Sequence, residues 1–353
     1  MIFELKQLAV FFEEESLQHL EQVYTQKDYS KVAILCDSNT HEHCLADFLA
    51  DCPFLPGDQI EILELEPGED TKSIEVLAQL WDAMGALALD RNSLVINLGG
   101  GVICDLGGFA ASTFMRGIDF VNFPTSLLAM VDASVGSKTG INFGGYKNRI
   151  GLFADPLMVG IIPDFLQSLP ADELASGWAE MLKHGLIADF NHYQDLIRRK
   201  PKSESLNKEL IEHSVSLKAE VVKEDKQEGG RRKILNFGHS VGHALESYYH
   251  QAGMAISHGH AVALGMQVEL ALSATYAGLD SQEASSMIAA LKQFYAFPKV
   301  EIEAEVFHQL LAGDKKNSGG QLRLVLLAEP GKAVYDVEVP AESIWSSLQD
   351  QQQ

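Results

Sequence analysis

The first 160 residues alternate short apolar runs with segments of helical periodicity, and this alternation limits the fold more than any other feature. Strand-like runs cover residues 31–36, 59–65, 93–98 and 119–123. Turn residues follow two of these runs, at Asp37-Ser-Asn39 and at Gly99-Gly-Gly101, and Pro124 ends another. Residues 71–88 carry apolar side chains at helical spacing. Strands that alternate with helices in this way indicate βαβ units on a parallel sheet.

Beyond about residue 165 the pattern becomes helical. Helices are expected at 172–188, 205–224, 237–249, 260–277 and 281–295, with one late strand at 321–327. A chain of 353 residues is long enough for two domains. We therefore expect an α/β, Rossmann-like nucleotide-binding domain over residues 1–165, followed by a mainly α-helical domain over residues 166–353.

The charge balance excludes some classes of partner. The chain has 49 acidic and 27 basic residues and a net charge of −22, so it repels phosphate backbones and anionic lipid surfaces. A general nucleic-acid binder or membrane-surface protein is therefore not expected. The longest apolar stretch, residues 259–279, is interrupted by His260, Gln267 and Glu269, which indicates a buried helix rather than a membrane span.

The N-terminal residues and the cysteines predict a cytoplasmic location. The first residues lack the basic region and the uninterrupted apolar core of a signal peptide. The four cysteines form no CxxC pair and no disulfide framework, which is typical of reduced, buried thiols; they are Cys36, Cys44, Cys52 and Cys104.

A glycine-rich turn over residues 94–108 is the first candidate ligand site. A strand runs into three glycines and then into a probable helix, an arrangement that lets the backbone approach a pyrophosphate at a helix N-terminus. The strict G-x-G-x-x-G spacing is absent because Cys104 stands where the last glycine belongs. The turn is therefore also consistent with a tight connection between a strand and a helix that binds nothing. Asp105 could then be an ordinary acidic residue in the first turn of the helix, or it could face the ligand.

The segment 123–148 favours an anion pocket. It combines Lys138 and Lys147 with many small polar residues and with Asp132. Its Gly-x-Lys-Thr string at residues 136–139 lacks the glycine spacing of a P-loop.

A third set of residues predicts a divalent metal site. Glu180 lies in an expected helix, and His239 and His243 are four residues apart, on one helical face. His258 and His260 add two more candidates. One carboxylate with two or three imidazoles is the ligand set of a catalytic Zn²⁺ or a similar ion. The spacing alone nominates both His239 and His243, and the missing glutamate of H-E-x-x-H argues against a metalloprotease.

Taken together, these segments resemble the 3-dehydroquinate synthase family. The motifs occur in order over residues 30–330: Gly99-Gly-Gly-Val-x-x-Asp105, Lys138-Thr-Gly-Ile-Asn142, Glu173-Leu-Ala-Ser-Gly-x-Ala-Glu-x-x-Lys183, Arg232-x-x-x-Asn-Phe-Gly-His-x-x-Gly-His243, His258-Gly and Asp314-Lys-Lys316. The resemblance implies a homodimeric lyase of the shikimate pathway that uses NAD and a divalent metal, usually Zn²⁺ with Co²⁺ as an alternative. Its substrate would be 3-deoxy-D-arabino-heptulosonate 7-phosphate, and its products 3-dehydroquinate and phosphate. The chemistry would be transient oxidation, phosphate elimination, reduction and an intramolecular aldol reaction.

The resemblance also implies roles for individual residues. The metal ligands would be Glu180, His239 and His258, with His243 contacting substrate as a proton shuttle instead. The catalytic and substrate-binding set would be Asp132, Lys138, Asn148, Lys183, Lys218, Arg232, Asn236, His243 and Lys315, with Arg116 reaching the phosphate pocket of the partner subunit. The NAD-binding set would be Asp37, Asn39, Glu69, Lys72, Gly100, Gly101, Val102, Asp105, Thr125, Ser126, Leu128, Lys138, Lys147, Phe165 and Ser168.

Several alternatives stay open at this point. Glu69 and Lys72 have the i,i+3 spacing of a plain surface ion pair. Ser137 stands where the family often has glycine, and His260 where many members have glutamate, which leaves His260 as a rival to His258 for the metal. The rival functions are a related sugar-phosphate cyclase acting on a substrate such as sedoheptulose 7-phosphate, an iron-type alcohol or glycerol dehydrogenase, and a non-catalytic NAD-binding regulator.

Overall fold

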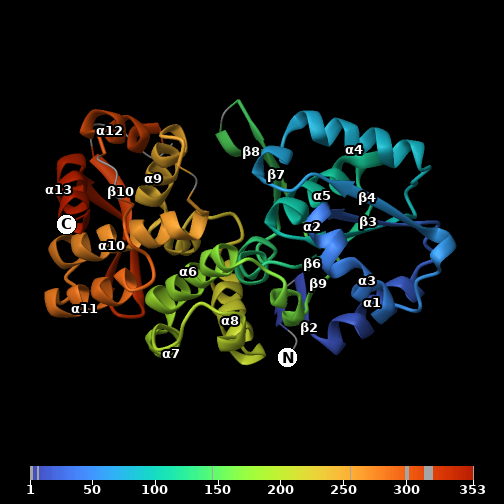
Figure 1. The fold of residues 1–353 in the computed structure, drawn as a ribbon, viewed down its shortest axis with the longest axis horizontal. Helices are drawn as coiled ribbons and strands as arrows, with labels where there is room; N and C mark the ends of the chain where they lie inside the picture. The colour runs from blue at the N-terminus through green and yellow to red at the C-terminus, as the bar shows by residue number, and fades with distance from the viewer. Residues whose placement is uncertain are drawn as a thin grey trace. The chain divides into compact units, whose positions relative to one another are not determined.

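The computed structural model describes residues 3–5, 8–144, 146–254, 256–298, 302–313 and 321–352. The chain forms two compact units, drawn in blue to green and in green to red in Figure 1. The first contains residues 1–170 together with 207–219, and the second contains residues 171–206 and 220–353. The segment 207–219 therefore joins a unit from which it is separated in the sequence.

The first unit is built on a seven-stranded sheet in the order β1-β2-β9-β6-β5-β3-β4. All pairings are parallel except the one between β1 and β2. The strands are β1 (Phe3–Leu5), β2 (Leu8–Phe12), β3 (Val32–Asp37), β4 (Ile60–Leu65), β5 (Leu94–Gly99), β6 (Asp119–Pro124) and β9 (Val159–Ile161). The four strands expected from the sequence are confirmed, while β1, β2 and β9 are too short or too irregular in pattern to have been expected.

Helices cover both faces of this sheet (Figure 1). They are α1 (Glu14–Gln26), α2 (Ser38–Thr40), α3 (Ala46–Asp51), α4 (Ile74–Ala86) and α5 (Gly101–Thr113). On one face, Leu80 of α4 and Leu106 of α5 belong to a core cluster with Leu35 of β3. On the other face, Phe48 of α3 packs edge-on against Phe123 of β6, with ring centroids 4.8 Å apart. Because both faces are buried, the central strands are apolar at nearly every position.

A separate antiparallel hairpin follows β6 in the chain. It consists of β7 (Lys138–Phe143) and β8 (Tyr146–Phe153). The two strands approach closely at Gly140, where a Cβ would lie 2.5 Å from the carbonyl oxygen of Ile150. The hairpin overlaps the second half of the segment 123–148, in which the sequence predicted an anion pocket.

The second unit is mainly helical. Its helices are α6 (Ala171–Ala188), α7 (Phe190–Ile197), the end of α8 (Lys208–Glu224), α9 (His239–Gln251), α10 (His258–Tyr276), α11 (Ser281–Lys292), α12 (Ala304–Gly313) and α13 (Ala341–Gln352). The strands β10 (Gln321–Glu329) and β11 (Lys332–Pro340) pair as a hairpin. The expected helices and the late strand are confirmed. In the part of the chain that is described, no helix has the length and apolar character needed to cross a bilayer.

Two helix boundaries in this unit differ from the sequence expectation for local reasons. α9 begins at His239 rather than at residue 237 because Gly238 adopts the left-handed conformation, with φ of 78°. α10 begins at His258 because the Ser257 side chain accepts a hydrogen bond from the His260 N–H as an N-cap. Both histidines of interest therefore occupy the first position of a helix.

Glycines bring α6, α9 and α10 into unusually close contact. A Cβ on Gly265 of α10 would lie 2.0 Å from the Gly238 carbonyl oxygen, at the start of α9. A Cβ on Gly259, also in α10, would lie 2.0 Å from the Ser176 carbonyl oxygen of α6. Only glycine permits backbones to approach this closely, so α10 is held against both neighbours near its N-terminal end.

Candidate metal and nucleotide sites

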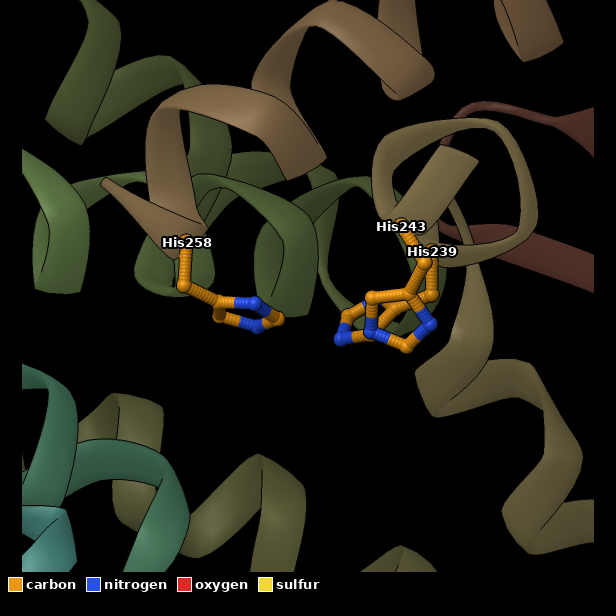
Figure 2. Close-up of side chains that lie close together, drawn as sticks. All are labelled: His239, His243 and His258. Atoms are coloured by element: carbon orange, nitrogen blue, oxygen red, sulfur yellow. The ribbon is translucent and has the colours of Figure 1, made fainter. Parts of the chain in front are cut away.

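Three histidines and one glutamate of the second unit converge at the start of α9 and α10. One ring nitrogen each of His239, His243 and His258 lies within 4.8 Å of the others. Figure 2 shows the His258 ring directed toward those of His239 and His243. Glu180 Oε1 of α6 lies 3.7 Å from His239 Nε2 and 3.8 Å from His258 Nε2. The close packing of α6, α9 and α10 thus assembles a four-donor cluster from residues far apart in the sequence.

The Glu180 carboxylate fits a site built for a cation. Glu180 is fully buried, and among the described residues its Oε1 has no hydrogen-bond partner, while the Lys183 ammonium contacts its Oε2. Its ion-pair neighbours are the ammonium of Lys183, one turn along α6, and the two imidazoles. A carboxylate out of water needs positive charge or donors around it, and a carboxylate with imidazoles suits Zn²⁺ or Co²⁺.

Neighbouring groups on the Nδ1 side orient the imidazoles of His239 and His258. His239 Nδ1 lies 3.2 Å from the Phe237 carbonyl oxygen, and because a carbonyl only accepts, Nδ1 carries the proton and Nε2 keeps its lone pair. His258 Nδ1 lies 3.6 Å from Glu246 Oε2 on α9. A partner on the second ring nitrogen is the usual arrangement for a metal-binding histidine.

Electrostatics keep His239 neutral. Burial lowers its pKa well below the usual value, and the neighbouring basic groups of Lys183, His243 and His258 lower it further. A neutral imidazole is the form that binds a metal ion, so no proton has to be displaced at neutral pH.

His260 occupies a different environment from His258. Its Nε2 lies 3.0 Å from the Ala296 carbonyl oxygen, and its ring meets Tyr295 edge-on at 5.6 Å. The Tyr295 hydroxyl donates to the Ala175 carbonyl oxygen at 2.7 Å. His260 is thereby engaged in packing α10 against neighbouring segments, while His258 faces the cluster.

In the first unit, the NAD candidates gather at the carboxyl edge of the parallel sheet. Asp37 ends β3, Gly100 follows β5 and Thr125 follows β6. The Thr125 N–H donates to the Gly99 carbonyl oxygen at 3.0 Å, which joins two of these strand ends. A Cβ on Gly100 would meet Ser126 Oγ at 3.5 Å. Ligands of open α/β sheets bind at this edge, and the N–H groups of a helix's first turn, such as that of α5, suit a pyrophosphate.

The other NAD candidates lie in the same unit. Asp37 caps α2, its side chain accepting the Thr40 N–H. Leu128 immediately precedes a turn of π-helix at Ala129–Ala133, a rare geometry that is frequent at functional sites. Phe165 is buried, and the Ser168 hydroxyl donates to its carbonyl oxygen. Asn39, Lys138 and Lys147 are exposed.

Lys72 is the centre of a hydrogen-bond network in the first unit. Its Nζ contacts Asp105 Oδ2 at 2.5 Å and also donates to Asn148 Oδ1. The Asn148 N–H donates to Asn142 Oδ1 at 2.8 Å, and Asn142 Nδ2 donates to Glu69 Oε1 at 2.7 Å. The alternative of a surface ion pair between Glu69 and Lys72 is wrong, because Lys72 is buried and pairs with Asp105.

This network ties the glycine turn to the hairpin. Burial raises the pKa of Asp105, and the positive charge of Lys72 opposes that shift. Asn148 and Ser137 both have positive φ, of 51° and 62°, the conformation that glycine adopts most easily. This conformation gives a physical reason for the glycine that the family often has at position 137.

Asp132 and Lys218 form an ion pair within the first unit. Lys218 Nζ lies 2.5 Å from Asp132 Oδ1 and also donates to the Asp132 carbonyl oxygen. Lys218 is almost fully buried. Through this pair, Lys218 in the second half of α8 places a cation next to the π-helical turn that carries Asp132, although the two residues are 86 positions apart in the chain.

Arg232 and Asn236 of the second unit are positioned by the loop before α9. Arg232 is buried and donates to the Lys226 carbonyl oxygen at 2.6 Å, and Asn236 Nδ2 donates to Glu228 Oε1 at 2.6 Å. The Asp225 carboxylate accepts the N–H groups of Gly229, Gly230 and Arg232 at 3.1, 2.7 and 3.1 Å. These backbone N–H groups lower the pKa of Asp225, so its carboxylate stays ionised at neutral pH and keeps these three contacts.

Two predicted residues remain to be placed. Arg116 is exposed and has a positive φ of 73°, in a short turn between α5 and β6. Lys315 lies outside the described residues.

Three supporting acids were not singled out from the sequence. Glu246 lies three residues after His243, at a spacing that could have signalled its place on the same helical face. Glu269 is a lone acid in a long apolar run, and by itself that pattern indicates only that the run is not a membrane span. Asp225 precedes a Gly-Gly pair at residues 229–230, which is a recognisable turn signal.

Known proteins share both the sequence and the fold. Residues 62–176 match the family described as 3-dehydroquinate synthase N-terminal, and residues 177–317 match 3-dehydroquinate synthase C-terminal. A 3-dehydroquinate synthase of Parabacteroides distasonis is 41% identical over 334 residues, which is 93% of each chain.

Two solved structures extend the comparison to the fold. A 2-deoxy-scyllo-inosose synthase complexed with carbaglucose-6-phosphate, NAD⁺ and Co²⁺ is 23% identical with a TM-score of 0.81, covering 98% of this chain and 97% of that one. A 2-epi-5-epi-valiolone synthase of Streptomyces hygroscopicus with NAD⁺ and Zn²⁺ bound is 24% identical with a TM-score of 0.80, covering 97% and 96%. Both likenesses span nearly the whole chain.

Proposed function

Because the chain belongs to the 3-dehydroquinate synthase family, we propose that it converts 3-deoxy-D-arabino-heptulosonate 7-phosphate to 3-dehydroquinate and phosphate. The observation that carries the proposal is the buried Glu180 carboxylate beside three converging imidazoles. A non-catalytic NAD-binding protein has no need for such a cluster.

The proposed cofactors are NAD and a divalent metal, Zn²⁺ or Co²⁺. Glu180, His239 and His258 would hold the metal, and the carboxyl edge of the first unit's sheet would hold NAD. When bound, NAD supplies a reversible oxidation, and the metal supplies charge that stabilises a developing alkoxide. The donor set, the neutral His239 and the glycine turn before α5 all suit these groups.

The chain's own residues would bind and orient the substrate. Lys183, Lys218 and Arg232 are cations that are buried or nearly so, and they suit carboxylate, hydroxyl and phosphate groups of a small polyanion. Asn148 and Asn236 add amide contacts, as would Lys138 and Lys315. His243 is exposed at the edge of the cluster, where it would move a proton to or from the substrate. Several charge-assisted contacts to one flexible sugar would restrict it to a reactive geometry.

Product stoichiometry tests the proposal. Purified protein loaded with Zn²⁺ or Co²⁺ is incubated with NAD⁺ and the heptulosonate phosphate, and phosphate, dehydroquinate and NADH are measured together. We expect phosphate and dehydroquinate in equal amounts with no net NADH, because the oxidation is reversed within each turnover. Net NADH would indicate a dehydrogenase instead, and NAD binding without turnover would indicate a regulator. Turnover of sedoheptulose 7-phosphate in preference to the heptulosonate would indicate a sister cyclase.

We further propose that the protein acts as a homodimer in which Arg116 serves the partner's site. The test is complementation between two inactive variants, Arg116→Ala and His258→Ala, co-expressed with different tags. A mixed dimer has one site with both groups intact, so random pairing should restore about a quarter of the wild-type activity. Each variant expressed alone is the control. Mixed dimers that stay inactive would contradict the role of Arg116 in the partner's site.

A further inference from the structure

Glu269 is a fully buried acid on α10 that the proposed mechanism does not use. Its Oε2 accepts the Gly238 N–H at 2.5 Å, immediately before α9 begins. Among the described residues its Oε1 has no hydrogen-bond partner. Burial raises the pKa of Glu269 to about 8, and the backbone N–H groups of Gly238 and Val241 offset part of that shift. A group this costly to bury, placed in an apolar helix, calls for a role.

The Gly238 N–H belongs to the same peptide group as the Phe237 carbonyl. That carbonyl oxygen lies 3.2 Å from His239 Nδ1 and accepts its proton. Glu269 and His239 are therefore joined through one peptide unit, with a carboxyl oxygen of Glu269 on its N–H and the imidazole on its C=O. His239 Nε2, on the opposite side of the ring, lies 3.7 Å from Glu180 Oε1 in the cluster of Figure 2.

We propose that Glu269 is a positioning residue that sets the orientation and ligand strength of His239 through the peptide group between Phe237 and Gly238. This inference rests on the proposed metal site. An acceptor on the N–H side of a peptide polarises its carbonyl, and linked hydrogen bonds strengthen one another. A stronger acceptor at Nδ1–H makes Nε2 a better metal donor and restricts rotation of the ring.

The backbone at this point needs an external anchor. Gly238, the N-cap residue of α9, is in the left-handed conformation and has no side chain with which to cap the helix. A Cβ on Gly238 would lie 2.5 Å from Met266 Cγ and 2.7 Å from the Val262 carbonyl oxygen, so the peptide fits tightly against α10. The Gly238 N–H donates to Glu269, on that same helix. The geometry thus links His239 and the helix that begins with His258.

Three substitutions separate this role from plain core packing. Glu269→Gln keeps an acceptor oxygen at the same length, Glu269→Asp keeps the carboxyl group but is one methylene too short, and Glu269→Met removes the acceptor. The matched control is Gln267→Met, because Gln267 is equally buried on α10 but donates to the Tyr295 carbonyl oxygen at 2.8 Å instead of contacting α9.

The measurement is Co²⁺ binding to the metal-free full-length protein, followed by visible absorption and by competition with a chelator, with thermal unfolding recorded for each variant. We expect Glu269→Met and Glu269→Asp to lose about 10- to 100-fold in Co²⁺ affinity, the usual effect of removing an outer-sphere partner. Their Co²⁺ absorption bands should also change. Glu269→Gln should keep most of the affinity, and Gln267→Met should bind Co²⁺ normally even when it is equally destabilised.

Other results would overturn the inference. Glu269→Asp or Glu269→Met with the affinity and spectrum of Gln267→Met would reduce Glu269 to core packing, and so would a Gln variant as weak as the others. If Glu269→Met does not fold, the comparison between Glu269→Asp and Glu269→Gln decides the matter. Wild-type protein that binds no Co²⁺ would count against the proposed metal site itself, which is a separate failure.

Discussion

Replacing His258 with alanine is expected to abolish both metal binding and turnover, whereas replacing His260 with alanine leaves the metal in place. His258 lies in the cluster, 3.8 Å from Glu180 Oε1 and supported by Glu246. His260 instead contacts the Ala296 carbonyl oxygen and Tyr295. The metal's contribution to the transition state is several kcal/mol, and each 1.36 kcal/mol is a tenfold change in rate, so activity should fall by about 10³-fold or more.

Metal content by elemental analysis and phosphate release measure the two effects in parallel. Both variants should fold, because neither removes a large buried side chain, and circular dichroism checks this. A His258→Ala protein that retains stoichiometric metal, together with a His260→Ala protein that loses it, would reverse the assignment of the two histidines.

Replacing Gly265 with alanine is expected to lower the free energy of unfolding far more than the same change at an exposed glycine. The new Cβ would lie 2.0 Å from the Gly238 carbonyl oxygen and 2.7 Å from the Gly242 backbone nitrogen. Backbone atoms cannot rotate away, so α9 and α10 would have to separate. Overpacking a core typically costs about 1–3 kcal/mol, and we expect the upper end of that range, which for a chain of this length is a fall of roughly 4 °C in melting temperature.

Gly85→Ala is the control for the methyl group itself. Gly85 lies exposed in α4, and nothing stands within 4 Å of its added Cβ. Alanine there should be neutral or stabilise by up to about 1 kcal/mol, because it favours the helix and restricts the unfolded chain. Gly265→Ala should also weaken Co²⁺ binding, because His239 and His258 begin the two helices that are forced apart. Equal melting temperatures for wild type and Gly265→Ala would show that the helices separate without cost.

The supporting residues mark the limit of prediction from the sequence. Lys72 was recognised as a candidate, yet its partner Asp105 lies 33 positions away in the chain and becomes a neighbour only when α4 and α5 cover one face of the sheet. Glu269 was visible only as an interruption of an apolar run. Its role depends on a contact with Gly238, which is 31 residues away in the chain and becomes a neighbour only when α10 packs against α9. No local sequence pattern encodes that contact.

The sequence by itself determined the fold class, the central strands, most helices and the chemical character of the site residues. These features follow from local periodicity, from turn residues and from motifs read in order, all of which act over a few residues. The tertiary structure decided which donors meet. Spacing nominated His239 and His243, which share α9, but Glu180 and His258 join them only because Gly259 and Gly265 let α10 approach the backbones of α6 and α9. Such contacts depend on close packing between distant segments, and the periodicity of one helix carries no information about the backbone against which it will lie.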